Sequence, residues 1–421
     1  MKLPHPPSHN THTLPNGLRL IHEHSDSAVV YCGYVIKAGT RHEEEADSGM
    51  AHFIEHMSFK GTERRRSFHI ANGLERVGGD LNAFTNKQET VYHATVLRND
   101  FVRAAELLTD IVCRSTYPQH EIDREVEVIC DEIDSYLDTP SELIFDEFES
   151  MVFAGSPLGR DILGSAERLR TYRTADALRF ARKWYRPENA VFFVYGNLDF
   201  NKIVKTLEKQ TRDLSDEIGT NKPQALFINT PASAFPPYSP QIRETHRDTH
   251  QAHVLIGART FGGNDPHRFA LLLLNNMLGG PGMNSRLNMS LREKAGLVYS
   301  VDAYLSSYPD TGLWNVYFGC DTGDVERCRR LVERELRRFI DNPLTPTQLA
   351  AAKKQLKGQV GISCDASESY ALALGKTYAH YGIHRNVDDI LQRIDEITAA
   401  DVQQTAAKVY APEQLSTLIY R

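Results

Sequence analysis

The segment His52-Phe53-Ile54-Glu55-His56 carries three side chains that together could bind a divalent metal and use it. In an α-helix of 3.6 residues per turn, positions 52, 55 and 56 lie on one face. Two imidazoles on that face are suitable zinc ligands, and the carboxylate between them could act as a base toward a water molecule. The spacing is the reverse of the HExxH spacing found on many zinc-binding helices. We therefore interpret the segment as a zinc-binding helix.

The same three residues could also occur together by chance, since the chain contains 17 histidines. The neighbouring residues favour the metal, because they make the other side of the helix apolar and predict burial: Met50, Ala51, Phe53, Ile54, Met57 and Phe59. Buried imidazoles and a buried carboxylate are costly unless they have partners, and a metal ion would be such a partner.

A zinc site needs a third protein ligand, and the acidic segment 121–138 offers candidates. Apolar residues recur along this segment at helical spacing. Glu125 and Glu132 are seven residues apart on the face next to this apolar stripe, so both carboxylates can point inward. The other acidic residues are interpreted as solvent-exposed: Glu121, Asp123 and Asp131.

The 421-residue chain contains an internal duplication. The segments KWYRPEN at 183–189 and KVYAPEQ at 408–414 match at a constant offset of 225, and an apolar strand follows each. The proline in each copy explains why a preceding helix ends there. We predict an α+β fold with two homologous α/β-roll domains, each a mixed β-sheet with helices packed on it. Their predicted boundaries are 1–220 for the zinc-binding domain, 221–240 for a linker and 241–421 for the second domain.

Apolar periodicity predicts the elements that would position the candidate residues. In the first half we expect strands at 28–38, 80–85 and 90–96, and helices at 100–113, 120–137, 141–152 and 174–185. In the second half we expect strands at 252–259, 298–304 and 312–320, and a helix at 266–278.

The second half lacks the candidate metal residues. Its equivalent positions carry Leu272, Asn275 and Asn276 in place of the HxxEH residues, and Ala352 and Gln359 in place of Glu125 and Glu132. Simultaneous loss of all these residues is easier to explain by one metal site in one half than by a structural role in both. We therefore predict one metal site per chain.

The sequence HFIEHMSFKGT at 52–62, with Glu132 lying 76 residues after His56, resembles the M16 zinc metallopeptidases, also called inverzincins. That family includes pitrilysin, the insulin-degrading enzymes and the mitochondrial processing peptidase. HMSFKGT is most similar to the processing-peptidase branch and its compact bacterial relatives, and Thr13–Leu18 resembles the family's first strand. The resemblance covers essentially the whole chain. It implies one Zn²⁺ held by His52, His56 and Glu132, with Glu55 as general base and Glu125 orienting a ligand histidine.

Two further segments gain roles from this resemblance. Asn82, Ala83 and Phe84 resemble the edge strand that pairs with an extended substrate, although they could form an ordinary paired strand. Arg292 and Tyr299 resemble an arginine and a tyrosine that reach the active site from the inactive half and donate hydrogen bonds to the substrate and its oxyanion. From their spacing alone, they would be a surface ion pair and a core tyrosine.

The composition is that of an ordinary globular protein, with 41% hydrophobic and 24% charged residues. The net charge of −7 argues against nucleic acid as a partner. No apolar run is long enough to span a membrane, and no apolar signal core is visible, so we expect a cytoplasmic protein without a membrane partner. The six cysteines form no CxxC pair, and we expect them to be reduced.

Together these features predict a zinc-dependent endopeptidase acting on oligopeptides or unfolded, presequence-like polypeptides. The resemblance implies a chamber of four such domains, so we expect a homodimer or a heterodimer with a related M16 subunit. The acidic runs 43–45 and 131–149 could attract basic peptides, but we interpret them as solvated surface. The alternative is a non-catalytic structural or peptide-binding subunit of the same fold, which the complete set of ligands and base disfavours.

Overall fold

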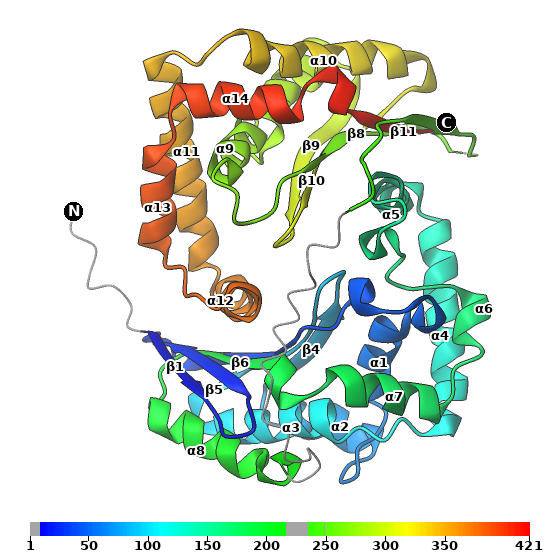
Figure 1. Cartoon of the computed structure of the whole chain (residues 1–421), viewed down its shortest axis with the longest axis vertical. Helices are drawn as coiled ribbons and strands as arrows, with labels where there is room; N and C mark the ends of the chain where they lie inside the picture. Colours follow the sequence, from blue (N-terminus) through cyan, green and yellow to red (C-terminus); the bar gives the residue numbers. More distant parts are fainter. Residues whose placement is uncertain (1–8, 216–234, 248) are drawn as a thin grey trace. The chain divides into compact units, whose positions relative to one another are not determined.

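The computed structural model describes residues 9–215, 235–247 and 249–421. These residues form two compact units (Figure 1). Unit 1 comprises the described residues within 1–134, 160–233 and 363–386, and unit 2 comprises those within 135–159, 234–362 and 387–421. Each unit has a mixed β-sheet with packed helices, so the predicted α+β fold is confirmed.

The sheets of the two units share one strand order. The six-stranded sheet of unit 1 has the order β1 (His9–Thr13), β2 (Arg19–Glu23), β6 (Ala190–Tyr195), β3 (Val29–Ile36), β5 (Thr90–Leu97) and β4 (Asp80–Thr85). The five-stranded sheet of unit 2 has the order β7 (Ile242–Thr245), β11 (Ser416–Tyr420), β8 (Ala252–Thr260), β10 (Gly312–Cys320) and β9 (Val298–Ser307). The pairs β2–β6 and β7–β11 are parallel, and the other pairs are antiparallel. Five strands of unit 1 therefore correspond in order and direction to the five of unit 2.

Both faces of the unit 1 sheet are buried. Leu20 and Phe192 point to one face, and their neighbours Ile21 and Phe193 point to the other. The first face packs against helices of the N-terminal half: α1 (Met50–Ser58), α2 (Ser67–Glu75), α3 (Phe101–Cys113), α4 (Gln119–Leu137), α7 (Thr174–Trp184) and α8 (Phe200–Gln210). The second face packs against α12 (Ser367–Tyr381). Because these strands are covered on both faces, their sequences are nearly continuous apolar runs.

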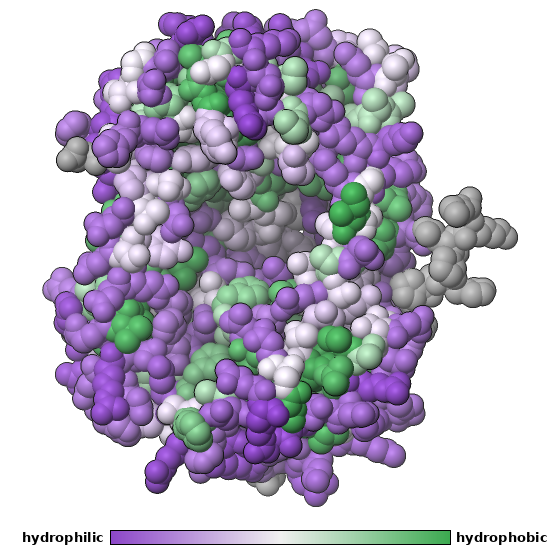
Figure 2. All heavy atoms as spheres, turned by 180° about the vertical axis from the view of Figure 1, so that it is seen from behind, coloured by the Kyte–Doolittle hydropathy of each residue, from purple (hydrophilic) through white to green (hydrophobic). Residues whose placement is uncertain are grey.

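Unit 2 is built in the same way. One face of its sheet packs against α9 (Arg268–Gly279), α10 (Val325–Asp341), α11 (Pro346–Asp365), α13 (Val387–Glu396) and α14 (Ala399–Val409). Leu255 and Leu418 on the other face pack against Ile144 and Phe148 of α5 (Pro140–Val152). On the face of the molecule in Figure 2, hydrophilic residues cover most of the surface and hydrophobic ones form small separate patches. Most large apolar side chains are instead collected in these buried clusters.

Each unit takes one helix from the other half of the sequence. Helices α5 and α12 begin at Pro140 and Ser367, and the same offset of 227 relates the first residues of α4 and α11, Gln119 and Pro346. The exchanged helices are therefore equivalent members of the duplication. The predicted domains, 1–220 and 241–421, are continuous in sequence, whereas the compact units exchange these segments.

The predicted strands and helices are present, with ends within three residues of those expected. The expected first strand at Thr13–Leu18 is wrong, because β1 ends at Thr13 and residues 14–18 form the turn to β2. Gly17 has a φ of 90°, which side-chain-bearing residues rarely adopt, so this turn requires glycine. Residues 221–234 of the predicted linker lie outside the described residues, and Phe235 and Tyr238 pack in unit 2.

All six cysteines are free thiols, and four of them are buried. None of the helices within the described residues has the length and apolar character needed to cross a bilayer.

Candidate metal centre

Helix α1 carries the HxxEH segment, and its first turn is fixed by a buried carboxylate. The helix begins after Gly49, whose φ of 82° suits glycine. Glu43, which is 4% exposed, accepts hydrogen bonds from the backbone N–H groups of Gly49 at 3.0 Å and Ala51 at 2.8 Å. Burial raises the pKa of Glu43 to about 8, although these two hydrogen bonds oppose the shift. This contact fixes the end of α1 that holds His52.

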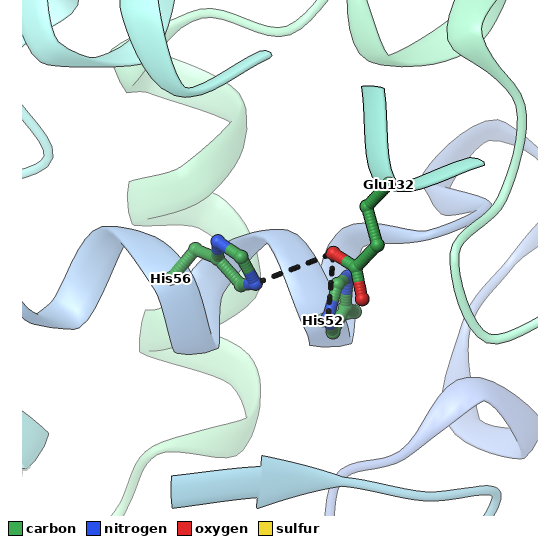
Figure 3. Close-up of side chains that lie close together, drawn as sticks. All are labelled: His52, His56 and Glu132. Carbon is green, nitrogen blue, oxygen red and sulfur yellow. Dashed lines mark ion pairs between the residues drawn. The ribbon is translucent and has the colours of Figure 1, made fainter. Parts of the chain in front are cut away.

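His52 and His56 project from α1 toward Glu132, which reaches them from α4 (Figure 3). Oε2 of Glu132 lies 3.9 Å from Nε2 of His52 and 3.8 Å from Nε2 of His56. The three candidate ligand atoms all lie within 4.8 Å of one another. Across residues 9–215, 235–247 and 249–421, no other group of three His, Cys, Asp or Glu side chains has this geometry.

The three side chains fit zinc. Tetrahedral ligands at zinc–ligand distances of about 2.0–2.2 Å lie roughly 3.3–3.6 Å apart, so the separations of 3.9 and 3.8 Å between Glu132 and the two imidazole nitrogens require a contraction of only about 0.5 Å. Two imidazoles and a carboxylate are also a common donor set of catalytic zinc, and they leave one coordination position open.

The other nitrogen of the His56 ring is held by a buried carboxylate that is paired with a partly exposed lysine. Nδ1 of His56 lies 3.0 Å from Oε1 of Glu125, whose Oε2 lies 2.6 Å from Nζ of Lys60. Burial raises the pKa of Glu125, but its hydrogen bonds with His56 and Lys60 outweigh burial and leave the pKa lowered. An ionised carboxylate at this position fixes the orientation of the imidazole and makes it a better ligand.

The two histidines differ in their electrostatic surroundings. Burial, followed by the charge of His56, lowers the pKa of His52 to about 3, so His52 is neutral and ready to bind a metal. Burial also lowers the pKa of His56, but its hydrogen bond with Glu125 and the charges of Glu55, Glu125 and Glu132 outweigh burial and leave the pKa raised. Nδ1 of His52 is buried and has no hydrogen-bond partner among the described residues.

Glu55 lies between the two histidines with only 9% of its surface exposed. Its Oε2 accepts a hydrogen bond of 2.6 Å from the hydroxyl of Thr85, the last residue of β4. Burial raises the pKa of Glu55, and the charge of Glu132 adds to the increase, while Thr85 and His56 oppose it. A carboxylate with a raised pKa can both accept and return a proton near neutral pH.

Asn82, Ala83 and Phe84 lie on β4, the edge strand of the unit 1 sheet. Among the described residues, β5 is the strand with which β4 pairs, and the other edge of β4 is open. The backbone N–H of Ala83 donates a 2.8 Å hydrogen bond to Oδ1 of Asn82. An open strand edge can pair with an extended peptide, and β4 ends at Thr85, in contact with Glu55.

Arg292 and Tyr299 lie together in unit 2. Arg292 belongs to η7 (Asn288–Lys294), a π-helical segment, and Tyr299 is the second residue of β9. The guanidinium carbon lies 5.6 Å from the centre of the Tyr299 ring. Tyr299 is 84% exposed, so the alternative of a core tyrosine is wrong. Arg292 also makes a long ion pair of 3.7 Å with Glu293.

Sequence reasoning missed three residues of the site: Glu43, Lys60 and Thr85. Glu43 was expected on a solvated acidic surface, but it is buried against the backbone of α1. Lys60 follows His56 by four residues, a spacing that can place two side chains near one shared partner. The contact between Thr85 and Glu55 joins a strand to a helix, and no local pattern signals it.

The duplicated roll, with one His-His-Glu cluster among its described residues, has the features of a metal centre of the inverted HxxEH class. The family description "Insulinase (Peptidase family M16)" matches residues 19–166, and "Peptidase M16 inactive domain" matches residues 173–356. This chain belongs to the M16 family.

Curated relatives extend over nearly the whole chain. An uncharacterized zinc protease of Streptomyces coelicolor is 34% identical over 401 residues, which cover 94% of this chain and 86% of the relative. The uncharacterized zinc protease YmxG of Bacillus subtilis is 29% identical over 409 residues and 97% of each chain.

Solved structures share the fold. A protease from Helicobacter pylori has a TM-score of 0.88 at 20% identity, covering 99% of this chain and 100% of that one. A peptidase M16 inactive domain from Pseudomonas fluorescens has a TM-score of 0.87 at 19% identity, covering 98% of this chain and 97% of that one.

Proposed function

We propose that this chain is a zinc-dependent endopeptidase that hydrolyses peptide bonds in oligopeptides and unfolded, presequence-like polypeptides. One observation carries the proposal: a buried carboxylate, Glu55, lies between two histidines that share a helix face and meet Glu132. The names of the relatives, zinc proteases of the same family, support it.

His52, His56 and Glu132 would hold one zinc ion per chain. When bound, zinc would polarise a substrate carbonyl and lower the pKa of a water molecule at the site. Glu125 and Lys60 would keep the His56 ring in the ligating orientation, because they hold its Nδ1 at a fixed position.

Glu55 would act as general base and then as general acid. It would accept the proton of the attacking water and deliver it to the nitrogen of the leaving amine. The Thr85 hydroxyl donates to Oε2 of Glu55, which leaves Oε1 to carry the proton. Arg292 and Tyr299 are proposed as donors to the oxyanion, since a guanidinium and an exposed phenol both suit a developing negative charge.

The substrate would bind as an additional strand along β4. The N–H of Ala83 now donates to the side chain of Asn82, and a peptide carbonyl could take that donor in place of Asn82. Recognition through backbone groups reads few side chains, which suits an enzyme for varied unfolded peptides.

We further propose that the active form is a dimer, either of two such chains or with a related M16 subunit, in which four rolls enclose the substrate. Light scattering of the purified chain would measure its mass. A monomer that cleaves peptides at full rate would contradict this part of the proposal.

The proposed activity is tested by incubating the zinc-loaded chain with a mixture of quenched-fluorescent peptides. Glu55→Gln should retain zinc and reduce cleavage by about 10²–10⁴-fold. Glu127→Gln is the matched control, because it makes the same change at an exposed position of α4. Equal cleavage by wild type and Glu55→Gln would overturn the assignment of the base.

A further inference from the structure

Unit 2 contains a cavity of about 540 Å³ whose lining includes no residue of the candidate metal centre. Segments around η7, α10 and the beginning of α11 form its walls. Four cationic side chains line the cavity, together with one acidic side chain: Arg286, Lys294, Arg334, Arg338 and Glu335. The lining therefore carries an excess of positive charge.

The single carboxylate organises two of the cations. The side chain of Glu335 is 4% exposed, and its two oxygens lie 2.9 and 3.0 Å from Nη1 of Arg338. Arg334 lies 3.6 Å from the same carboxylate and donates a 3.2 Å hydrogen bond to the hydroxyl of Ser290. A buried acid thus holds both guanidiniums at the wall, where each has further donors for a ligand.

The other two cations make no direct hydrogen bond or ion pair with an acidic side chain among the described residues. Within the part of the chain that the structure describes, neither Arg286 nor Lys294 makes a hydrogen bond or an ion pair. The Arg286 guanidinium lies 3.8 Å from the centre of the Phe339 ring, and this stacking fixes its plane. Burial lowers the pKa of Arg286, and the charge of Arg338 adds to the decrease, while the charge of Glu335 opposes it.

We propose that this cavity binds a small multivalent oxyanion of the phosphate or polyphosphate class. Four cations against one carboxylate leave a strong excess of positive charge, and fixed guanidiniums suit bidentate contacts with phosphate oxygens. The volume lies within the range of small-ligand sites. An acidic protein segment is the competing ligand. A compact ligand is favoured, because the site is concave and the buried carboxylate of Glu335 holds two guanidiniums in fixed positions.

Occupation of the cavity would affect the segment that carries Arg292. Ser290 and Lys294 flank Arg292 on η7, and π-helical turns frequently occur at functional sites. An anion joining η7 to α10 would restrict this segment and change peptide cleavage. That consequence rests on the proposed function, whereas the binding itself does not.

The test is calorimetric titration of inorganic pyrophosphate into the zinc-loaded, full-length chain. Wild type should bind one pyrophosphate per chain. Lys294→Glu and Arg334→Glu should each weaken binding at least about tenfold, the loss expected for one charge-assisted contact. Arg337→Glu is the matched control, because Arg337 is exposed on α10 and does not line the cavity. Extraction of zinc by pyrophosphate would be common to all four proteins and would cancel in the comparison.

Several outcomes would overturn the proposal. One is no binding by wild type, and another is equal affinity in all four proteins. Binding of hexaglutamate but not pyrophosphate, with the same dependence on Lys294 and Arg334, would assign the cavity to an acidic peptide. Lys294→Ala removes an exposed side chain and provides a milder variant if the charge reversals impair folding. Because heat is measured rather than cleavage, failure here is distinct from failure of the proposed peptidase.

Discussion

Both units place equivalent helices against equivalent edge strands, but among the described residues only unit 1 has a candidate metal centre. In unit 1 the hydroxyl of Thr85 on β4 donates to Glu55 on α1. In unit 2 Asn275 on α9, at the position of Glu55, donates from Nδ2 to the backbone carbonyl of Ala303 on β9 at 3.2 Å. Unit 2 therefore retains the contact between helix and edge strand but lacks the carboxylate proposed as the general base.

At other positions of the candidate metal centre, unit 2 also has residues that cannot replace those of unit 1. Asn276 stands in place of His56, and its buried Nδ2 has no partner among the described residues. Ala352 stands in place of Glu125 and cannot form the carboxylate pair that holds His56. The roll of unit 2 is complete without any of the ligands, so the fold does not require them. In unit 1, metal binding and catalysis explain these buried polar groups better than a contribution to the stability of the fold does.

The largest effect is expected from removing one candidate metal ligand of unit 1. His56→Ala should reduce bound zinc from about one ion per chain to nearly none and abolish cleavage, because two remaining ligands hold zinc weakly. Asn276→Ala, the equivalent change in unit 2, should leave the zinc content unchanged. Elemental analysis after dialysis measures both. Full zinc content in His56→Ala would show that the metal is held elsewhere.

The contribution of unit 2 to catalysis can be tested at its exposed tyrosine. Tyr299→Phe should lower kcat by about 10²–10³-fold if the phenol donates to the oxyanion. The melting temperature should not change, since the side chain is 84% exposed. Tyr304→Phe on the same strand is the control, as Tyr304 is 44% exposed. Equal kinetics of the two variants would remove Tyr299 from the mechanism.

The pair between Lys60 and Glu125 should have a smaller effect. Lys60→Ala should weaken zinc affinity by about 10–100-fold, because the carboxylate that orients His56 loses its counter-ion. Lys183→Ala removes a similar pair of 2.8 Å, but its partner Glu44 is exposed, so no change in affinity is expected. Competition with a fluorescent zinc chelator measures the affinities. A loss as large in Lys183→Ala would point to a general effect of charge.

The different surroundings of the two histidines predict how zinc affinity depends on pH. The pKa of His52 is lowered to about 3, whereas that of His56 is raised above its ordinary value of 6.5. As the pH falls through the pKa of His56, that ring becomes protonated and zinc must displace one proton. The apparent Kd should therefore rise about tenfold per pH unit, rather than a hundredfold. A hundredfold rise would mean that both histidines are protonated in the metal-free chain.

Features set by local pattern were predictable from the sequence, and features set by contacts between distant segments were not. The HxxEH spacing predicted α1, and the apolar stripe around Glu125 and Glu132 predicted α4, because helical periodicity is visible in a single segment. The cap from Glu43 and the hydrogen bond from Thr85 depend on the tertiary fold. The exchange of α5 and α12 was also invisible, since an amphipathic helix does not specify which sheet it covers.

The exchanged helices provide a second comparison between the units. On unit 1, two histidine–carboxylate pairs hold α12 and the residues that follow it: His380 of α12 with Glu89 at 2.5 Å, and His384, three residues after α12, with Glu23 at 2.7 Å. On unit 2, a partly exposed pair joins Glu147 of α5 to Arg247 at 2.7 Å. The unit 1 contacts are more deeply buried, so their loss should cost more.

His380→Ala should leave Glu89 as a buried carboxylate without this partner, which costs roughly 3–5 kcal/mol. In a unit of this size, that corresponds to a fall of about 6–15 °C in melting temperature. Arg247→Ala should change the melting temperature by only a few degrees, because its partner is about one-third exposed. Hydrogen exchange along α12 and α5 would locate each effect. Equal losses in the two variants would contradict the difference in burial.

The pair with Glu89 also predicts a response to acid. Burial raises the pKa of Glu89, but the hydrogen bond and charge of His380 outweigh burial and leave it lowered. A carboxyl with a lowered folded-state pKa contributes stability above its unfolded value of about 4.5, and this is lost as the pH falls through the folded value. His380→Ala removes the cause of the lowering, so its melting temperature should fall less than that of wild type between pH 5 and pH 3, by roughly a few degrees. Parallel acid profiles of the two proteins would mean that other carboxylates control the acid stability of unit 1.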